Sequence, residues 1–127
     1  ASVAQTNITN AGLWDKVEII TGAAVDSMQQ MEESGTAAFD FIFIDADKPS
    51  YTEYLQRSIR LSRPGTMIVV DNVIRKGEIL NENSTDEAVI GVKLFNECLA
   101  RTPGVTATLL PTFGIKEYDG MAIIVIN

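Results

Sequence analysis

The chain has 127 residues, a length that suits a single domain, and an ordinary globular composition. Its net charge of −7 provides no basic footprint, so we expect no nucleic-acid partner. No apolar stretch approaches the ~20 residues of a membrane span, so we expect no membrane partner. The absence of histidine excludes His-based nucleophile pairs and His–metal sites. The single Cys98 cannot form an internal disulfide, which fits a reducing compartment, and we expect a cytoplasmic protein.

Apolar periodicity and turn residues predict strands that alternate with helices. The predicted strands are residues 17–21, 39–45, 66–71, 106–112 and 120–126. The predicted helices end at Gly12, run from Val25 to Ser34, begin at Pro49, and begin at a capping box in Ser84–Glu87. We expect a turn at residues 63–65 and loops at 73–83 and 113–119. This alternation predicts an α/β fold with a mostly parallel sheet and an antiparallel pair at its end.

Polar side chains follow two of the predicted strands. Asp45, Asp47 and Lys48 come after strand 39–45, and Asp71 and Asn72 come after the next one. In an open parallel sheet, ligands bind at the carboxyl ends of the strands. Asp45, Asp71 and Asn72 form an all-oxygen set that suits a hard cation such as Mg²⁺. Lys48 stands where it could move a proton.

Each of these residues also has a simpler interpretation. Asp45 or Asp47 alone could be a helix N-cap, Asp71-Asn72 alone could be a turn, and Lys48 alone could be a solvated side chain. Their combination favours a metal site. Asp45-x-Asp47 also fits locally a glycosyltransferase that holds a metal–diphosphate. A phosphohydrolase fits less well, because Pro49 replaces its usual Thr or Val.

Several motifs over nearly the whole chain occur in a specific order and spacing. They are an A-x-x-N-x-x-x-A-G-L helix end from Ala4, V-x-x-x-x-G-x-A from Val17, FDFIFIDADK with Tyr51, RPG, IVVDN and Asp119-Gly120. Together they resemble the cation-dependent O-methyltransferases of the catechol and caffeoyl-CoA type, which are class I S-adenosylmethionine (SAM) enzymes. The resemblance implies methyl transfer from SAM to a hydroxyl of a catechol-like or phenolic small molecule.

The resemblance assigns metal and proton chemistry to matching positions. Asp45, Asp71 and Asn72 would be the metal ligands, with Mg²⁺ expected and Mn²⁺ or Ca²⁺ left open. Lys48 would be the catalytic base. Burial or neighbouring cations that lowered its pKa would help it to accept the phenolic proton.

The resemblance also implies cofactor and substrate contacts. The backbone of Ala24 would contact the SAM adenine, and Asp45 and Asp47 would lie near its methionyl end. Asp119 would lie close to the acceptor pocket. Arg75 occupies a position where the plant caffeoyl-CoA enzymes often carry an aromatic residue, and it could meet an anionic substrate tail.

The family order of strands is 3-2-1-4-5-7-6, and strands 1 and 2 are expected upstream of Ala1. The chain would then be a single truncated domain over 1–127, the C-terminal part of a class I (Rossmann-like) methyltransferase without the glycine-rich SAM loop. Strand 39–45 would be an apolar edge, which with the dimers common in the family predicts a homodimer or homo-oligomer. The alternative is a SAM-incompetent relative that acts as an oligomeric or binding module.

Overall fold

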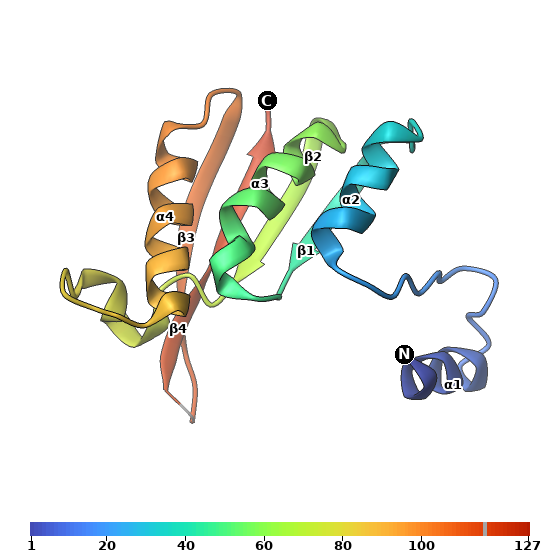
Figure 1. Ribbon diagram of the computed structural model, residues 1–127, viewed down its shortest axis with the longest axis horizontal. Helices are drawn as coiled ribbons and strands as arrows, with labels where there is room; N and C mark the ends of the chain where they lie inside the picture. The colour runs from blue at the N-terminus through green and yellow to red at the C-terminus, as the bar shows by residue number, and fades with distance from the viewer. Residues whose placement is uncertain (116) are drawn as a thin grey trace.

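The computed structural model describes residues 1–115 and 117–127, which form one β-sheet and a set of helices (Figure 1). No helix in these residues is long and apolar enough to cross a membrane. The α-helices are α1 (Ser2–Asn10), α2 (Ala24–Glu33), α3 (Tyr51–Arg60) and α4 (Glu87–Arg101), and the short 3₁₀ segments are η1 (Lys48–Ser50) and η2 (Arg75–Leu80). The strands are β1 (Phe39–Ile44), β2 (Ser62–Asp71), β3 (Val105–Phe113) and β4 (Tyr118–Ile126).

The sheet has the order β1-β2-β4-β3. β1 pairs with β2 in parallel, and β4 pairs antiparallel with both β2 and β3. Three strands therefore run in one direction and only β4, the last strand in the chain, runs against them. This confirms the predicted mostly parallel sheet with an antiparallel last strand. The order also equals the 4-5-7-6 part of the predicted family order.

The hydrophobic core lies between one face of the sheet and helices α3 and α4. Ile68, Val70 and Ile124 are fully buried on the sheet side. Tyr51 of α3 and Phe95 of α4 meet edge to face, with ring centroids 5.7 Å apart. Burying each such side chain contributes about 1.5–3 kcal/mol. Burial confirms the predicted faces of α3 and α4, whose buried members are Tyr51, Tyr54, Leu55, Ser58, Val92, Phe95 and Leu99, while Ala88 is half-buried. The predicted face of α2, which consists of Val25, Met28 and Met31, is only half-buried.

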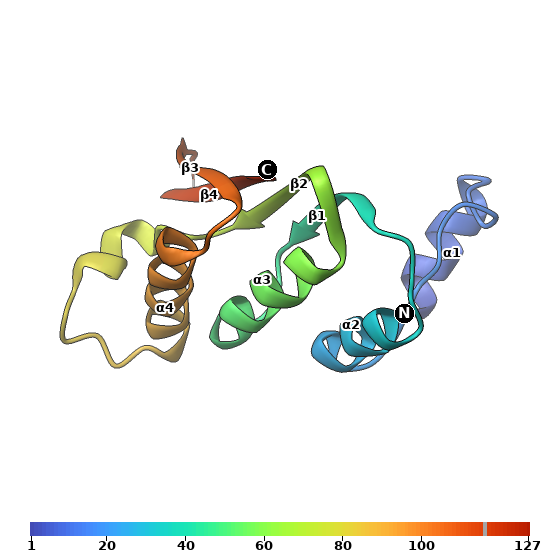
Figure 2. The ribbon, with the colours of Figure 1, turned by 90° about the horizontal axis from the view of Figure 1, so that it is seen from above.

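No helix of residues 1–115 and 117–127 covers the opposite face of the sheet. Figure 2 shows α2, α3 and α4 in a row beneath the strands, while α1 lies apart and has no buried residue. β1 is an edge strand, and its side chains Phe41 and Phe43 are 56% and 57% exposed. The prediction that strand 39–45 forms an apolar edge is therefore confirmed.

The predicted strand at residues 17–21 is wrong. These residues form no strand and pair with none of the four strands. β-branched side chains favour extended backbone, but a strand needs a hydrogen-bonded neighbour to complete its ladder. No described strand offers that neighbour to this segment.

Several boundaries also differ from the prediction. β2 begins at Ser62, because Phe39 pairs with Ser62 across an irregularity that contains the predicted turn at 63–65. The predicted loop 73–83 contains η2. Asp86 caps α4 by accepting a hydrogen bond from the Ala88 amide, whereas the capping box pointed to Ser84. β4 begins at Tyr118, so Asp119 lies in a strand rather than in the predicted loop.

Ion pairs attach α2 to the rest of the domain. Arg57 of α3 lies 3.3 Å from Glu32, and Arg60 lies 2.8 Å from the other oxygen of the same carboxylate. Arg57 also pairs with Glu53 at 3.0 Å. The hydrogen bond from Arg60 is the largest cause of a lowered pKa at Glu32. Because the folded pKa is lowered, the resulting stability is present above the unfolded pKa of about 4.3.

We expect Glu32→Gln to loosen α2 and to lower the midpoint of urea unfolding at pH 7. The difference from the wild type should shrink as the pH falls through the lowered pKa of Glu32, because protonation then removes the same ion pairs. Glu33→Gln is the control, since among the described residues the Glu33 side chain bonds to Gln29 of its own helix and to no other residue. An equal loss at pH 7 in both variants would contradict the role given to Glu32.

Candidate active site

The carboxyl ends of β1 and β2 place two predicted ligands side by side. The two strands run in parallel with Ile44 in register with Val70. Asp45 directly follows Ile44 in the sequence, and Asp71 directly follows Val70. The two carboxylates thus project from one corner of the sheet, as the sequence predicts for a ligand site.

Lys48 joins this corner through its amino group. Its Nζ lies 3.1 Å from Oδ1 of Asp45, 3.0 Å from the carbonyl of Ala46 and 4.8 Å from the ring centre of Tyr51. The Lys48 side chain is only 12% exposed, against 51% for Asp45. Burial alone would lower the pKa of Lys48, but the Tyr51 hydroxyl and the Asp45 carboxylate outweigh it and raise the pKa. The described residues around Lys48 therefore raise its pKa instead of lowering it.

The Asp71-Asn72 pair is held by its backbone. The carbonyl of Asp71 accepts a 2.8 Å hydrogen bond from the Tyr51 hydroxyl, and its Oδ1 accepts one of 2.8 Å from the Asn72 amide. Asn72 has a left-handed backbone with φ of 60°. Asparagine tolerates this conformation better than most residues. The chain therefore turns sharply at the end of β2.

Asp47 does not join the corner in the same way. One carboxylate oxygen accepts a hydrogen bond from Ser50, and the other accepts one of 2.6 Å from the Tyr54 hydroxyl. These bonds, that of Ser50 first, lower the pKa of Asp47. Asp47 thus fixes the turn from η1 into α3. With both oxygens engaged, it is poorly placed to act as the second carboxylate of a glycosyltransferase D-x-D site.

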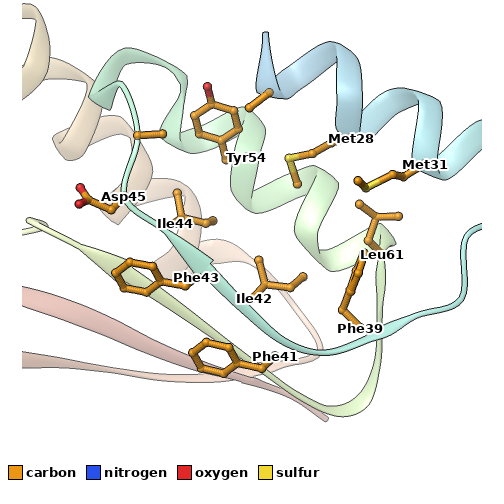
Figure 3. Close-up of a pocket in the computed structure, with 12 residues that line it drawn as sticks. Met28, Met31, Phe39, Phe41, Ile42, Phe43, Ile44, Asp45, Tyr54 and Leu61 are labelled. Carbon is orange, nitrogen blue, oxygen red and sulfur yellow. The ribbon is translucent and has the colours of Figure 1, made fainter. Parts of the chain in front are cut away.

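Ala24 and Asp45 line the same hollow, of about 340 Å³, between α2, α3 and β1. Figure 3 shows Met28 and Tyr54 on the helix side of β1, and Phe41 on its opposite side. Two of the predicted SAM contacts therefore share a largely apolar recess beside the sheet corner. Asp47 is not among the residues that line it.

Arg75 and Asp119 line a second hollow, of about 230 Å³, together with Lys76 and Asp86. The Nε of Arg75 is buried without a hydrogen-bond partner among the described residues. The two predicted substrate residues are thus brought together. They lie in a different recess from Ala24 and Asp45.

Gly91 supports the site and was missed at the sequence level. It lies within α4, and a Cβ at this position would stand 2.4 Å from the carbonyl oxygen of Lys48 and 2.7 Å from the Cα of Pro49. Only glycine lets η1 approach the helix this closely. An isolated glycine inside a helical pattern is the signal that could have revealed this contact.

No cluster of three or more His, Cys, Asp or Glu side chains in residues 1–115 and 117–127 is arranged to hold a metal ion. The predicted ligand set has two carboxylates and one amide. Metal binding therefore stays a prediction.

The strand order, the apolar recess and the polar corner define an α/β protein of the class that binds its ligands at strand ends. The family model described as O-methyltransferase matches residues 1–125. The chain is 56% identical to a catechol O-methyltransferase of Niastella koreensis and 40% identical to one of Mycobacterium tuberculosis, over its whole length in both cases. The chain belongs to the O-methyltransferase family, whose members are SAM-dependent enzymes.

Solved structures agree with this assignment. An O-methyltransferase of Bacillus cereus in complex with SAH superposes with a TM-score of 0.94 at 47% identity, over 99% of this chain and 57% of that one. An O-methyltransferase of Streptomyces achromogenes in complex with SAM gives a TM-score of 0.93 at 39% identity, over 99% and 56%. The chain spans 58% of the Niastella koreensis relative and 56% of that of Mycobacterium tuberculosis.

We expect Tyr54→Phe to remove a tyrosine that ionises late in an alkaline ultraviolet titration. Burial and the carboxylate of Asp47 raise the pKa of Tyr54 to about 12. The stability from this neutral phenol is full below the unfolded pKa of about 10 and is lost as the pH rises through 12. In Asp47→Asn the same phenol should ionise at lower pH. An unchanged titration in Asp47→Asn would refute the assigned contact.

We expect Gly91→Ala to lower the free energy of unfolding by about 1–3 kcal/mol, because the added methyl group collides with the backbone of η1. Helix propensity alone would change stability in the opposite direction by about 1 kcal/mol. Glu97→Ala on the exposed side of α4 is the control and should stay within about 0.5 kcal/mol of the wild type. Urea unfolding measures both, and a stabilised Gly91→Ala would disprove the close contact.

Proposed function

We propose that the protein works as a metal-dependent O-methyltransferase that transfers the methyl group of SAM to a hydroxyl of a catechol-like or phenolic acceptor. The observation that carries this proposal is the register of β1 with β2, which sets Asp45 and Asp71 side by side with Lys48 attached. The catechol O-methyltransferases among the relatives support the choice of acceptor. An acidic protein with no histidine suits oxygen-ligand chemistry at this corner.

The donor atoms fit a hard cation such as Mg²⁺, with Mn²⁺ and Ca²⁺ as alternatives. The bonds from Lys48 and from the Asn72 amide both reach Oδ1 atoms, and so neither engages the Oδ2 atoms of Asp45 and Asp71. Asp45, Asp71 and the Asn72 carboxamide would hold the ion. When bound, the ion would favour the oxyanion of the acceptor by direct coordination.

Lys48 is the proposed proton acceptor. Its amino group lies at the corner and can turn from Asp45 toward a bound hydroxyl, but it must first release the proton that Asp45 and Tyr51 help it to hold. The reaction itself is an in-line displacement at the methyl carbon. Much of its acceleration comes from alignment, which can contribute ~7–11 kcal/mol.

SAM would lie against the recess lined by Ala24 and Asp45. Asp47 would support that surface through its bonds to Ser50 and Tyr54. Arg75 and Asp119 would stand on the acceptor side, where the cation of Arg75 could meet an anionic tail. The exposed edge at β1 supports the further proposal of a homodimer or homo-oligomer, and the single Cys98 supports a cytoplasmic location.

Methyl transfer should be measured in a chain extended upstream to the length of the relatives, with catechol as the acceptor. We expect Asp71→Asn to reduce the rate about 100-fold or more, because the proposed ligand loses its negative charge while its bond to the Asn72 amide can remain. Asp40→Asn is the control, since Asp40 lies at the other end of β1 and pairs with Arg63. Activity that survives both Asp71→Asn and a chelator would refute the metal site and leave the family assignment standing.

Calorimetric titration of SAM into the 127-residue chain with Mg²⁺ present distinguishes an active enzyme from a binding module that does not bind SAM. Micromolar binding would mean that these residues, or a second copy, supply enough cofactor surface for an active enzyme. Absence of binding would limit catalysis to the longer chain and would favour a binding-module role for this one.

A further inference from the structure

The loop after β2 has an unusual backbone. Asn72, Arg75 and Lys76 have φ values of 60°, 52° and 57°, and Gly77 follows with 85°. Residues other than glycine rarely adopt this left-handed backbone conformation. Three such residues within five positions persist only where the surrounding structure holds them.

Asp119 of β4 holds this loop with a single carboxylate oxygen. Its Oδ1 accepts hydrogen bonds from the amides of Ile74 at 3.0 Å, Arg75 at 2.9 Å and Gly120 at 2.9 Å. The Gly120 carbonyl accepts a further bond of 2.9 Å from the Val73 amide. A charged acceptor makes these bonds stronger than a neutral one would.

Gly120 allows the approach that these bonds require. A Cβ at this position would stand 2.4 Å from Cδ1 of Ile74 and 2.9 Å from the carbonyl oxygen of Leu110. Asp119 therefore supplies the acceptor, and Gly120 supplies the space. The pair explains in physical terms why an Asp-Gly step opens this strand.

Two other elements hold the opposite side of the loop. Asn96 of α4 donates a 3.0 Å bond to the carbonyl of Val73, and Tyr51 of α3 donates to the carbonyl of Asp71. The peptide groups on both sides of Asn72 are thus fixed by α3 and β4, and the next peptide group is fixed by α4.

We propose that Asp119 is a positioning residue of the cation site: through the backbone of Ile74 and Arg75 it keeps Asn72 in the left-handed conformation that directs its carboxamide toward the corner. This inference rests on the proposed metal-dependent function. It gives Asp119 a role that acts through the loop and needs no contact with the acceptor.

The test compares Mn²⁺ affinity, by electron paramagnetic resonance, with amide hydrogen exchange in wild type, Asp119→Asn and Asp119→Ala. We expect Mn²⁺ affinity to fall about 10–100-fold in Asp119→Ala and less in Asp119→Asn, which keeps a neutral acceptor. The amides of Ile74 and Arg75 should exchange faster in the same order. Asp86→Asn is the matched control, because Asp86 lines the same hollow, makes no bond to the loop and remains a good helix cap as Asn.

Each outcome decides the inference. Faster exchange with an unchanged Mn²⁺ affinity would reduce Asp119 to a structural role and overturn it, while leaving the metal-dependent function intact. An equal loss of affinity in Asp86→Asn would assign the effect to general charge and would also overturn it. A wild type that binds no Mn²⁺ would refute the proposed metal site together with the inference. If Asp119→Ala does not fold, the comparison of Asp119→Asn with Asp86→Asn decides alone.

Discussion

The parallel pairing of β1 with β2 is the constraint on which the rest of this structure depends. The register that pairs Ile44 with Val70 places the carboxyl ends of β1 and β2 at one corner of the sheet. It thereby brings the polar residues of two separate sequence motifs together. A shift of one residue would move every side chain of β1 to the other face of the sheet. Burial of Ile44 and Val70 against α3 and α4 makes that shift costly, so packing on one face fixes which residues lie together at the strand ends.

The two faces of the sheet differ in what they contribute. The covered face contains the buried core, and the opposite face leaves Phe41, Phe43 and Met67 exposed. Large apolar patches of this kind mark surfaces made for contact. The chain spans less than two thirds of the length of the relatives that it matches. The strand ends thus lie between a face that helices cover and a face whose apolar side chains are exposed.

Much of this arrangement could be predicted from the sequence because local patterns determine it. Continuous apolar runs that end in Asp45 and Asp71 indicated buried strands and their polar ends, and the spacing of Tyr51, Phe95 and similar residues indicated the helix faces. The strand at 17–21 was wrongly predicted because propensity says nothing about a missing neighbour. The contacts of Asp119 and Gly91 were not foreseen, because both depend on which distant backbone approaches them.

The hydrogen bond from the Ile74 amide to Asp119 joins two residues that lie 45 positions apart in the chain. Contacts between such distant positions form only after the entropy of closing a long loop has been overcome, so they tend to appear late in folding. The corner at Asp71 and Asn72 is therefore complete only once β4 has paired with β2. Conversely, an opening that separates β4 from β2 would release the loop after β2 while the pairing of β1 with β2 still held. The loop thus reports on the integrity of the whole sheet, and an ion bound there would stabilise the last strand to join it.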